Sequence, residues 1–144
     1  MDTTSRLIEF VTNHWALSLA FIGISALIVV TEVRRRLYGV PQLGPHAATL
    51  VMNADDSVIL DVREDSEYKQ GHIAKAVHIP LGQLKQRIGE LDKYRERTVV
   101  AYCRTGHRSN SAAALLRKQG FDKIHNLAGG IVAWQNANLP VTKK

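Results

Sequence analysis

The chemistry available to this sequence centres on one cysteine. Cys103 is the only cysteine among the 144 residues, and Arg104 and Arg108 follow it closely. Guanidinium charges and the N–H groups at a helix start lower the pKa of a thiol, so we expect Cys103 to ionise near neutral pH. The resulting thiolate would be a nucleophile, and the same donors would bind an anionic substrate. A single cysteine excludes an internal disulfide, a Cys-x-x-Cys redox pair and a multi-cysteine zinc site.

The residues on either side of Cys103 predict the elements that position it. Residues 98–102, Thr-Val-Val-Ala-Tyr, predict a buried strand that ends immediately before the cysteine. Residues 109–119 have the apolar spacing of a helix, and Ser109 or Ser111 is the expected cap. The six-residue loop between strand and helix should therefore turn its backbone N–H groups toward the sulfur.

The remainder of the C-terminal part alternates short apolar runs with helical segments. The apolar runs are 58–60, 76–79, 98–102 and 123–127, and the helical segments are 46–53, 64–70, 81–94, 109–119 and 131–136. Runs without polar alternation indicate a sheet covered on both faces, and alternation with helices indicates parallel pairing. The predicted class is α/β with a central parallel sheet, whose ligand sites lie at the carboxyl ends of the strands.

The N-terminal part contains a long apolar segment. Residues 10–31 include no Asp, Glu, Lys or Arg, and as a helix they would extend for about 33 Å, enough to cross a bilayer. A signal peptide would need a basic start and a cleavage site, and an interfacial helix would need a polar face. We predict a transmembrane helix at about 10–31 within an N-terminal segment 1–36, then a linker 37–45 and a soluble domain 46–144.

The distribution of positive charge predicts the orientation of the chain. Arg34, Arg35 and Arg36 follow the apolar segment, which by the positive-inside rule places the C-terminal side in the cytoplasm. We therefore expect a single-pass protein of the cell inner membrane with a cytoplasmic catalytic domain, where Cys103 would stay reduced. The net charge of +6 includes no basic stripe interleaved with aromatic residues, so nucleic acid is not an expected partner.

Three separated motifs resemble those of the single-domain rhodaneses. They are DVREDSEYKQGHIAKAVHIP, CRTGHRS and NLAGGIVAWQNANLPV, and the resemblance covers roughly residues 46–142. It implies a doubly wound α/β domain in which Cys103 is the catalytic nucleophile. It further implies transfer of sulfane sulfur from a small anionic donor such as thiosulfate to a thiol, a protein acceptor or cyanide, through a persulfide and without a metal or organic cofactor.

The resemblance also assigns roles around the nucleophile. The loop residues that would contact substrate are Arg104, Thr105, Gly106, His107 and Arg108. Gly106 can adopt a positive φ, which lets the loop curl around a sulfur or an oxyanion. Asp61 and Arg63 are expected to support the site through a salt-bridge network that includes Glu67. The residues expected to have structural roles are His72, the turn pair Gly129 and Gly130, and Trp134 in the core.

Two other functions remain open at the level of sequence. Cysteine phosphatases and arsenate reductases also use a Cys…Arg loop, but the phosphatase pattern has five residues between Cys and Arg, whereas four separate Cys103 from Arg108. The second alternative is a membrane-tethered binding module or sulfur carrier with little free turnover, because the same persulfide serves either role.

Overall fold

The computed structural model describes residues 2–143, except the side chains of residues 7 and 35–38. The chain divides into two compact units, Met1–Gly39 and Val40–Lys144. The predicted basic flank falls partly outside the described residues, since it includes the side chains of residues 35 and 36.

The N-terminal unit consists of two helices, α1 (Thr3–Asn13) and α2 (Trp15–Tyr38). His14 leaves the helical conformation, with φ −123° and ψ 41°, so the single helix predicted over residues 10–31 is interrupted. Asn13 and His14 both have low helix propensity, which accounts for a break at this point. The part long and apolar enough to cross a membrane is Trp15–Arg34, with a mean hydropathy of 2.2. The large apolar side chains of this stretch are exposed, as lipid contact requires.

The C-terminal unit is built on a five-stranded sheet in which all strand pairs are parallel. The strands are β1 (Gln42–Leu43), β2 (Ser57–Asp61), β3 (Val77–His78), β4 (Thr98–Tyr102) and β5 (Ile124–Leu127), in the order β1-β5-β4-β2-β3. The helices are α3 (Pro45–Met52), α4 (Asp65–Gln70), α5 (Leu81–Arg87), α6 (His107–Lys118) and α7 (Gly130–Asn136), with a 3-10 helix η1 (Ile88–Tyr94).

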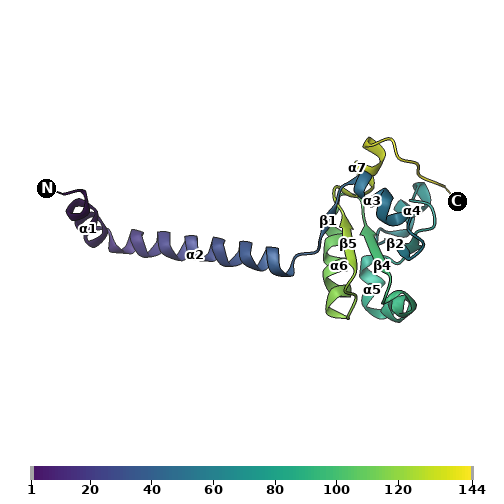
Figure 1. Cartoon of the computed structure of the whole chain (residues 1–144), viewed down its shortest axis with the longest axis horizontal. Helices are drawn as coiled ribbons and strands as arrows, with labels where there is room; N and C mark the ends of the chain where they lie inside the picture. Colours follow the sequence, from purple (N-terminus) through teal and green to yellow (C-terminus); the bar gives the residue numbers. More distant parts are fainter. Residues whose placement is uncertain (1, 144) are drawn as a thin grey trace. The chain divides into compact units, whose positions relative to one another are not determined.

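Successive residues of the central strands enter two separate cores. Leu60 and Ala101 pack on one side with Leu84 of α5 and Leu116 of α6. On the other side, Val100 packs with Ala48 of α3 and Trp134 of α7, and Trp134 is 5% exposed. Because side chains alternate across a strand, apolar residues at consecutive positions require helices on both faces of the sheet. The predicted doubly wound parallel α/β fold is confirmed (Figure 1).

The structure differs from the prediction in the segment that joins the two units. Residues 37–45 were expected to be a linker, but their second half belongs to the sheet. Val40 is buried, and Gln42 and Leu43 of β1 pair with Asn126 and Leu127 of β5. A two-residue strand carries no periodic signal, and the prolines and glycines around it are typical of a loop. The segment predicted as one helix over 81–94 also divides, into α5 and η1.

Candidate active site

Cys103 lies immediately after β4, at the carboxyl end of the central part of the sheet. Its side chain is 1% exposed and belongs to the core on the α6 side. The backbone N–H of Gly106 donates a hydrogen bond to Cys103 Sγ at 3.1 Å. Gly106 has φ +97°, and a Cβ there would come within 3.3 Å of the Gly129 nitrogen. Glycine at this position therefore allows the loop to turn tightly around the sulfur while it packs against the backbone at Gly129.

Two opposing effects set the ionisation of the cysteine. Burial penalises the thiolate and by itself would raise the pKa of Cys103. Hydrogen bonds from the Ser109 hydroxyl and from the backbone N–H groups of Ser109, Gly106 and Thr105 act in the other direction. The balance lowers the pKa of Cys103 below its ordinary value. The loop thus favours a reactive thiolate.

The predicted helix cap is wrong. Helix α6 begins at His107 with Gly106 as its N-terminal cap, so Ser109 is a helical residue and the loop is shorter than expected. Ser109 is fully buried, with its hydroxyl 3.4 Å from Cys103 Sγ and 2.5 Å from Asn126 Oδ1. Ser111 instead donates to the His107 carbonyl. The positive φ of Gly106 starts the helix early, which turns Ser109 inward toward the sulfur.

The start of α7 holds the loop of Cys103 by the carbonyl groups of that loop. The backbone N–H of Ile131 donates to the Cys103 carbonyl at 2.8 Å, and that of Val132 donates to the Arg104 carbonyl at 3.2 Å. A Cβ at Gly130 would lie 2.4 Å from the Cys103 carbonyl oxygen, closer than a side chain can approach. The glycine pair that was predicted as a turn therefore also allows the last helix to approach the loop.

The acidic and basic residues near the loop form two ion pairs. Arg63 is buried and binds Asp61, with Nη2 at 2.6 Å from Oδ2, and also donates to the Gly71 carbonyl. Arg108 binds Glu67 through two hydrogen bonds of 2.8 Å. This contact lowers the pKa of Glu67 to about 2. The Arg108 charge is consequently shared with a carboxylate, which weakens it as a binding site for a free anion.

A cavity of about 310 Å³ lies beside the loop, between α4 and α7. It is lined by Arg63, Glu67, Gln70, Gly71, Arg104, Ile131, Val132 and Gln135. Arg104 is exposed, and its side chain has no hydrogen-bond or ion-pair partner among residues 2–143. Thr105 of the loop and His107, the first residue of α6, are exposed and do not line the cavity. Of the predicted substrate-binding side chains, Arg104 is the one that lies beside this cavity.

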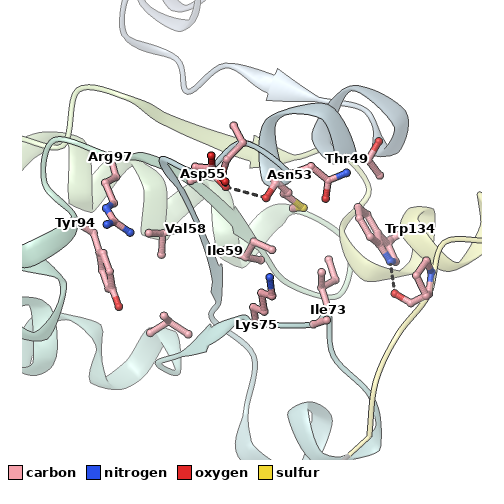
Figure 2. Close-up of a pocket in the computed structure, with 16 residues that line it drawn as sticks. Thr49, Asn53, Asp55, Val58, Ile59, Ile73, Lys75, Tyr94, Arg97 and Trp134 are labelled. Carbon is pink, nitrogen blue, oxygen red and sulfur yellow. Dashed lines mark hydrogen bonds between the residues drawn. The ribbon is translucent and has the colours of Figure 1, made fainter.

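A larger cavity, of about 510 Å³, lies at the opposite end of the strands. Figure 2 shows Lys75 near Ile59 and Ile73, with Tyr94 and Arg97 on the other side of the space. Most of its lining residues lie before or at the start of β2, β3 and β4, whereas Cys103 follows β4. Within the part of the chain that the structure describes, no cluster of His, Cys, Asp or Glu could hold a metal ion.

Two polar residues of the site were missed by the sequence analysis. Asn126 of β5 is 2% exposed, and its amide donates to the Gly106 carbonyl and to Gln42 Oε1. Gln42 belongs to β1, within the predicted linker. A buried asparagine in an apolar strand must find hydrogen-bond partners. The presence of Asn126 within the apolar run 123–127 was therefore the feature of the sequence that could have indicated its role.

Comparison with known proteins identifies relatives of the C-terminal unit and of the whole chain. Residues 46–137 match the family described as rhodanese-like domain. An uncharacterized protein of Escherichia coli K12, YibN, is 28% identical over 96% of this chain and 97% of its own length. A sulfurtransferase of Allochromatium vinosum is 39% identical over 62% of this chain and 81% of its own. The crystal structure of a rhodanese-related protein from Thermoplasma volcanium, 27% identical, superimposes with a TM-score of 0.66 over 72% of this chain and 99% of its own.

Proposed function

Because the chain belongs to the rhodanese-like domain family, we propose that it transfers sulfane sulfur through a persulfide on Cys103 while anchored to a membrane by α2. Relatives named sulfurtransferases support a sulfurtransferase-type enzyme. The observation that carries the proposal is the hydrogen bond from the Gly106 N–H to Cys103 Sγ, at the carboxyl end of β4. A buried sulfur that accepts a backbone N–H is stabilised as an anion.

The first step loads sulfur onto the enzyme. The Cys103 thiolate attacks the outer sulfur of thiosulfate, a sulfur–sulfur bond forms, and the bond within thiosulfate breaks. Its electron pair leaves with sulfite, and the enzyme keeps a persulfide whose negative charge lies on the outer sulfur. The backbone N–H groups of the loop, which surround Cys103 Sγ in the free enzyme, would stabilise that charge.

The second step releases the sulfur to an acceptor outside the chain. An acceptor thiolate attacks the outer sulfur, forms a persulfide of its own, and returns Cys103 to the thiolate. No internal acceptor competes, because Cys103 is the only cysteine. Cyanide would accept the sulfur in the same way and leave as thiocyanate.

Arg104 and Arg108 take different roles in this proposal. Arg104 lines the cavity beside the loop and has no partner among the described residues, so its guanidinium is available to bind the anionic donor. Arg108 is held by Glu67 and stabilises the position of α6 relative to α4. Thr105 of the loop and His107 at the start of α6 are both exposed, and they contact the donor or acceptor.

Mass spectrometry of the intact protein tests the persulfide. After incubation with thiosulfate and removal of excess donor, wild type should gain about 32 Da, the mass of the one sulfur atom carried by a covalent intermediate. Cys103→Ser should gain nothing. Absence of the adduct with thiosulfate and with polysulfide would exclude the persulfide mechanism. Loading without turnover on cyanide or small thiols would instead support a dedicated sulfur carrier.

We further propose that α2 anchors the chain in the cell inner membrane, with the catalytic domain in the cytoplasm. The apolar stretch Trp15–Arg34 is long enough to span the bilayer, and arginines at 34–36 lie toward its C-terminal end. An impermeant thiol reagent should label Cys103 in lysed cells and leave it unlabelled in intact cells. Equal labelling in both would contradict the orientation.

A further inference from the structure

The Ser109 hydroxyl has one proton and two acceptors within reach. Its oxygen lies 2.5 Å from Asn126 Oδ1 and 3.4 Å from Cys103 Sγ. Ser109 is fully buried and Asn126 is 2% exposed, so solvent does not readily supply a substitute partner to either. One proton cannot satisfy both acceptors, and the shorter contact favours Asn126.

The orientation of the Asn126 amide follows from its other contacts. Asn126 Nδ2 is 3.1 Å from the Gly106 carbonyl, which can only accept a hydrogen bond. It is also 2.8 Å from Gln42 Oε1, and Gln42 is oriented in turn because its Nε2 is 2.9 Å from the Val40 carbonyl. Both amide nitrogens therefore face carbonyl oxygens. Asn126 Oδ1 consequently faces Ser109 and accepts the hydroxyl proton.

We propose that Asn126 is a positioning residue that competes with Cys103 for the Ser109 proton, and that Gln42 holds Asn126 in the orientation this requires. The inference rests on the proposed persulfide function. While Cys103 is a thiol, Ser109 donates to Asn126, and the thiol can donate to the Ser109 oxygen. When Cys103 loses its proton to water, Ser109 can turn its own proton to the sulfur only by giving up the bond to Asn126.

Because Asn126 competes for the Ser109 proton, the Cys103 thiolate is less stable, and the persulfide form of the enzyme is more stable relative to that thiolate. Once Cys103 Sγ is bonded to the transferred sulfur, the negative charge moves to the outer sulfur, and the Ser109 proton returns to Asn126. A thiolate with a higher pKa is also the stronger nucleophile. Asn126 thus makes the thiolate more reactive toward the donor, but lowers the fraction of Cys103 that is ionised in the free enzyme. Gln42 extends the network to β1, the first strand of the C-terminal unit.

A double-mutant cycle on the pKa of Cys103 tests this inference. The pH dependence of alkylation by iodoacetamide reports Cys103 alone, since the chain has no other cysteine. Asn126→Ala should lower that pKa by about half a unit to one unit, because Ser109 no longer has a competing acceptor. In a Ser109→Ala background the same substitution should leave the pKa unchanged.

A merely structural role predicts a different pattern. If Asn126 only supports the loop, its removal disorders the N–H donors and raises the pKa of Cys103 whether or not Ser109 is present. An increase in the pKa, or an equal change in both backgrounds, would overturn the proposal. Asn136→Ala, a change at an exposed asparagine of α7, is the matched control and should have no effect.

Two further measurements keep the test decisive. If Asn126→Ala does not fold, Gln42→Ala at the exposed edge strand should shift the pKa in the same direction by a smaller amount, and a rise there overturns the inference. The mass of the thiosulfate-treated protein separates the two proposals. If the protein gains sulfur but the effects of the Asn126 and Ser109 substitutions on the pKa of Cys103 are additive, the role of Asn126 is contradicted and the persulfide function stands. If the effects are non-additive but the protein gains no sulfur, the persulfide function is contradicted and the role of Asn126 stands.

Discussion

Each end of the parallel sheet carries a cavity, and the larger of the two cavities lies at the end farther from Cys103. At the amino end, about 510 Å³ is bordered by the exposed residues Lys75 and Arg97 (Figure 2). At the carboxyl end, about 310 Å³ lies beside the loop of Cys103. Among the residues that the structure describes, only those at the carboxyl end include backbone N–H groups that converge on one buried atom and arginines held by buried or half-buried carboxylates.

The difference is that backbone N–H donors converge on Cys103 at the carboxyl end, and this convergence, more than the volume of a cavity, is the basis for proposing the site there. In parallel α/β sheets the loops after the strands meet at one edge, where helix starts supply free N–H groups. The cavity at the amino end is lined largely by the end of α3 and by residues at or before the starts of β2, β3 and β4. Variants at matched positions of the two ends therefore test whether sulfur transfer depends on the carboxyl end alone.

Gly130→Ala should have the largest effect. The added Cβ would lie 2.4 Å from the Cys103 carbonyl oxygen at a residue with φ +60°, so either α7 or the Cys103 loop must move. We expect a loss of about 3 kcal/mol in the free energy of unfolding, measured in urea, and loss of sulfur transfer. Gly82→Ala, where nothing lies within 4 Å, is the control and should be neutral or slightly stabilising. Equal effects of the two would contradict the close packing.

Arg104→Ala should weaken donor binding. Removal of one charge-assisted contact to thiosulfate is expected to raise KM about tenfold with little change in kcat, corresponding to about 1.4 kcal/mol. Arg97→Ala removes the same charge at the amino end of the sheet and should leave both constants unchanged. A similar increase in KM for both variants would show that the donor responds to net charge and not to a site.

Glu67→Gln should remove about 1 kcal/mol of stability at neutral pH, as expected for a half-buried bidentate pair. The Arg108 hydrogen bonds hold the pKa of Glu67 at about 2, below the unfolded value of about 4.3. The pair therefore contributes fully above about pH 4.3 and loses its contribution as the pH falls toward 2. Urea unfolding at pH 6 and pH 3 should show a smaller difference between wild type and variant at the lower pH. A difference independent of pH would contradict this coupling.

Lys75→Gly should have the smallest effect. Lys75 has φ +64°, a left-handed conformation that glycine adopts without strain. We expect a gain of about 0.5 kcal/mol in stability and unchanged sulfur transfer. Asn138→Gly, at φ +56°, provides a comparison outside the cavity. A fall in activity of Lys75→Gly alone would show that the cavity at the amino end takes part in function.

Much of the fold could be predicted because its signals are local. Apolar runs and helical spacing predicted the sheet and its flanking helices. The position of Cys103 after a buried strand indicated that the candidate site lies at the carboxyl edge of the sheet. The interruption of the N-terminal helix at His14 could not be inferred from hydropathy, which averages over such a residue. The strand β1 was missed because two residues leave no pattern, although they complete the sheet.

Residue types and near-neighbour spacing along the chain were enough to single out Cys103 as the candidate nucleophile and to predict the α/β class and an apolar helix. The three-dimensional packing was needed to establish that Ser109 faces the sulfur, that Arg108 is held by Glu67, and that Asn126 and Gln42 reach the loop. These contacts join residues far apart in the chain, and their geometry follows from how strands and helices pack. Hydrogen bonds depend on distances of a few tenths of an ångström, which residue spacing along the chain does not specify.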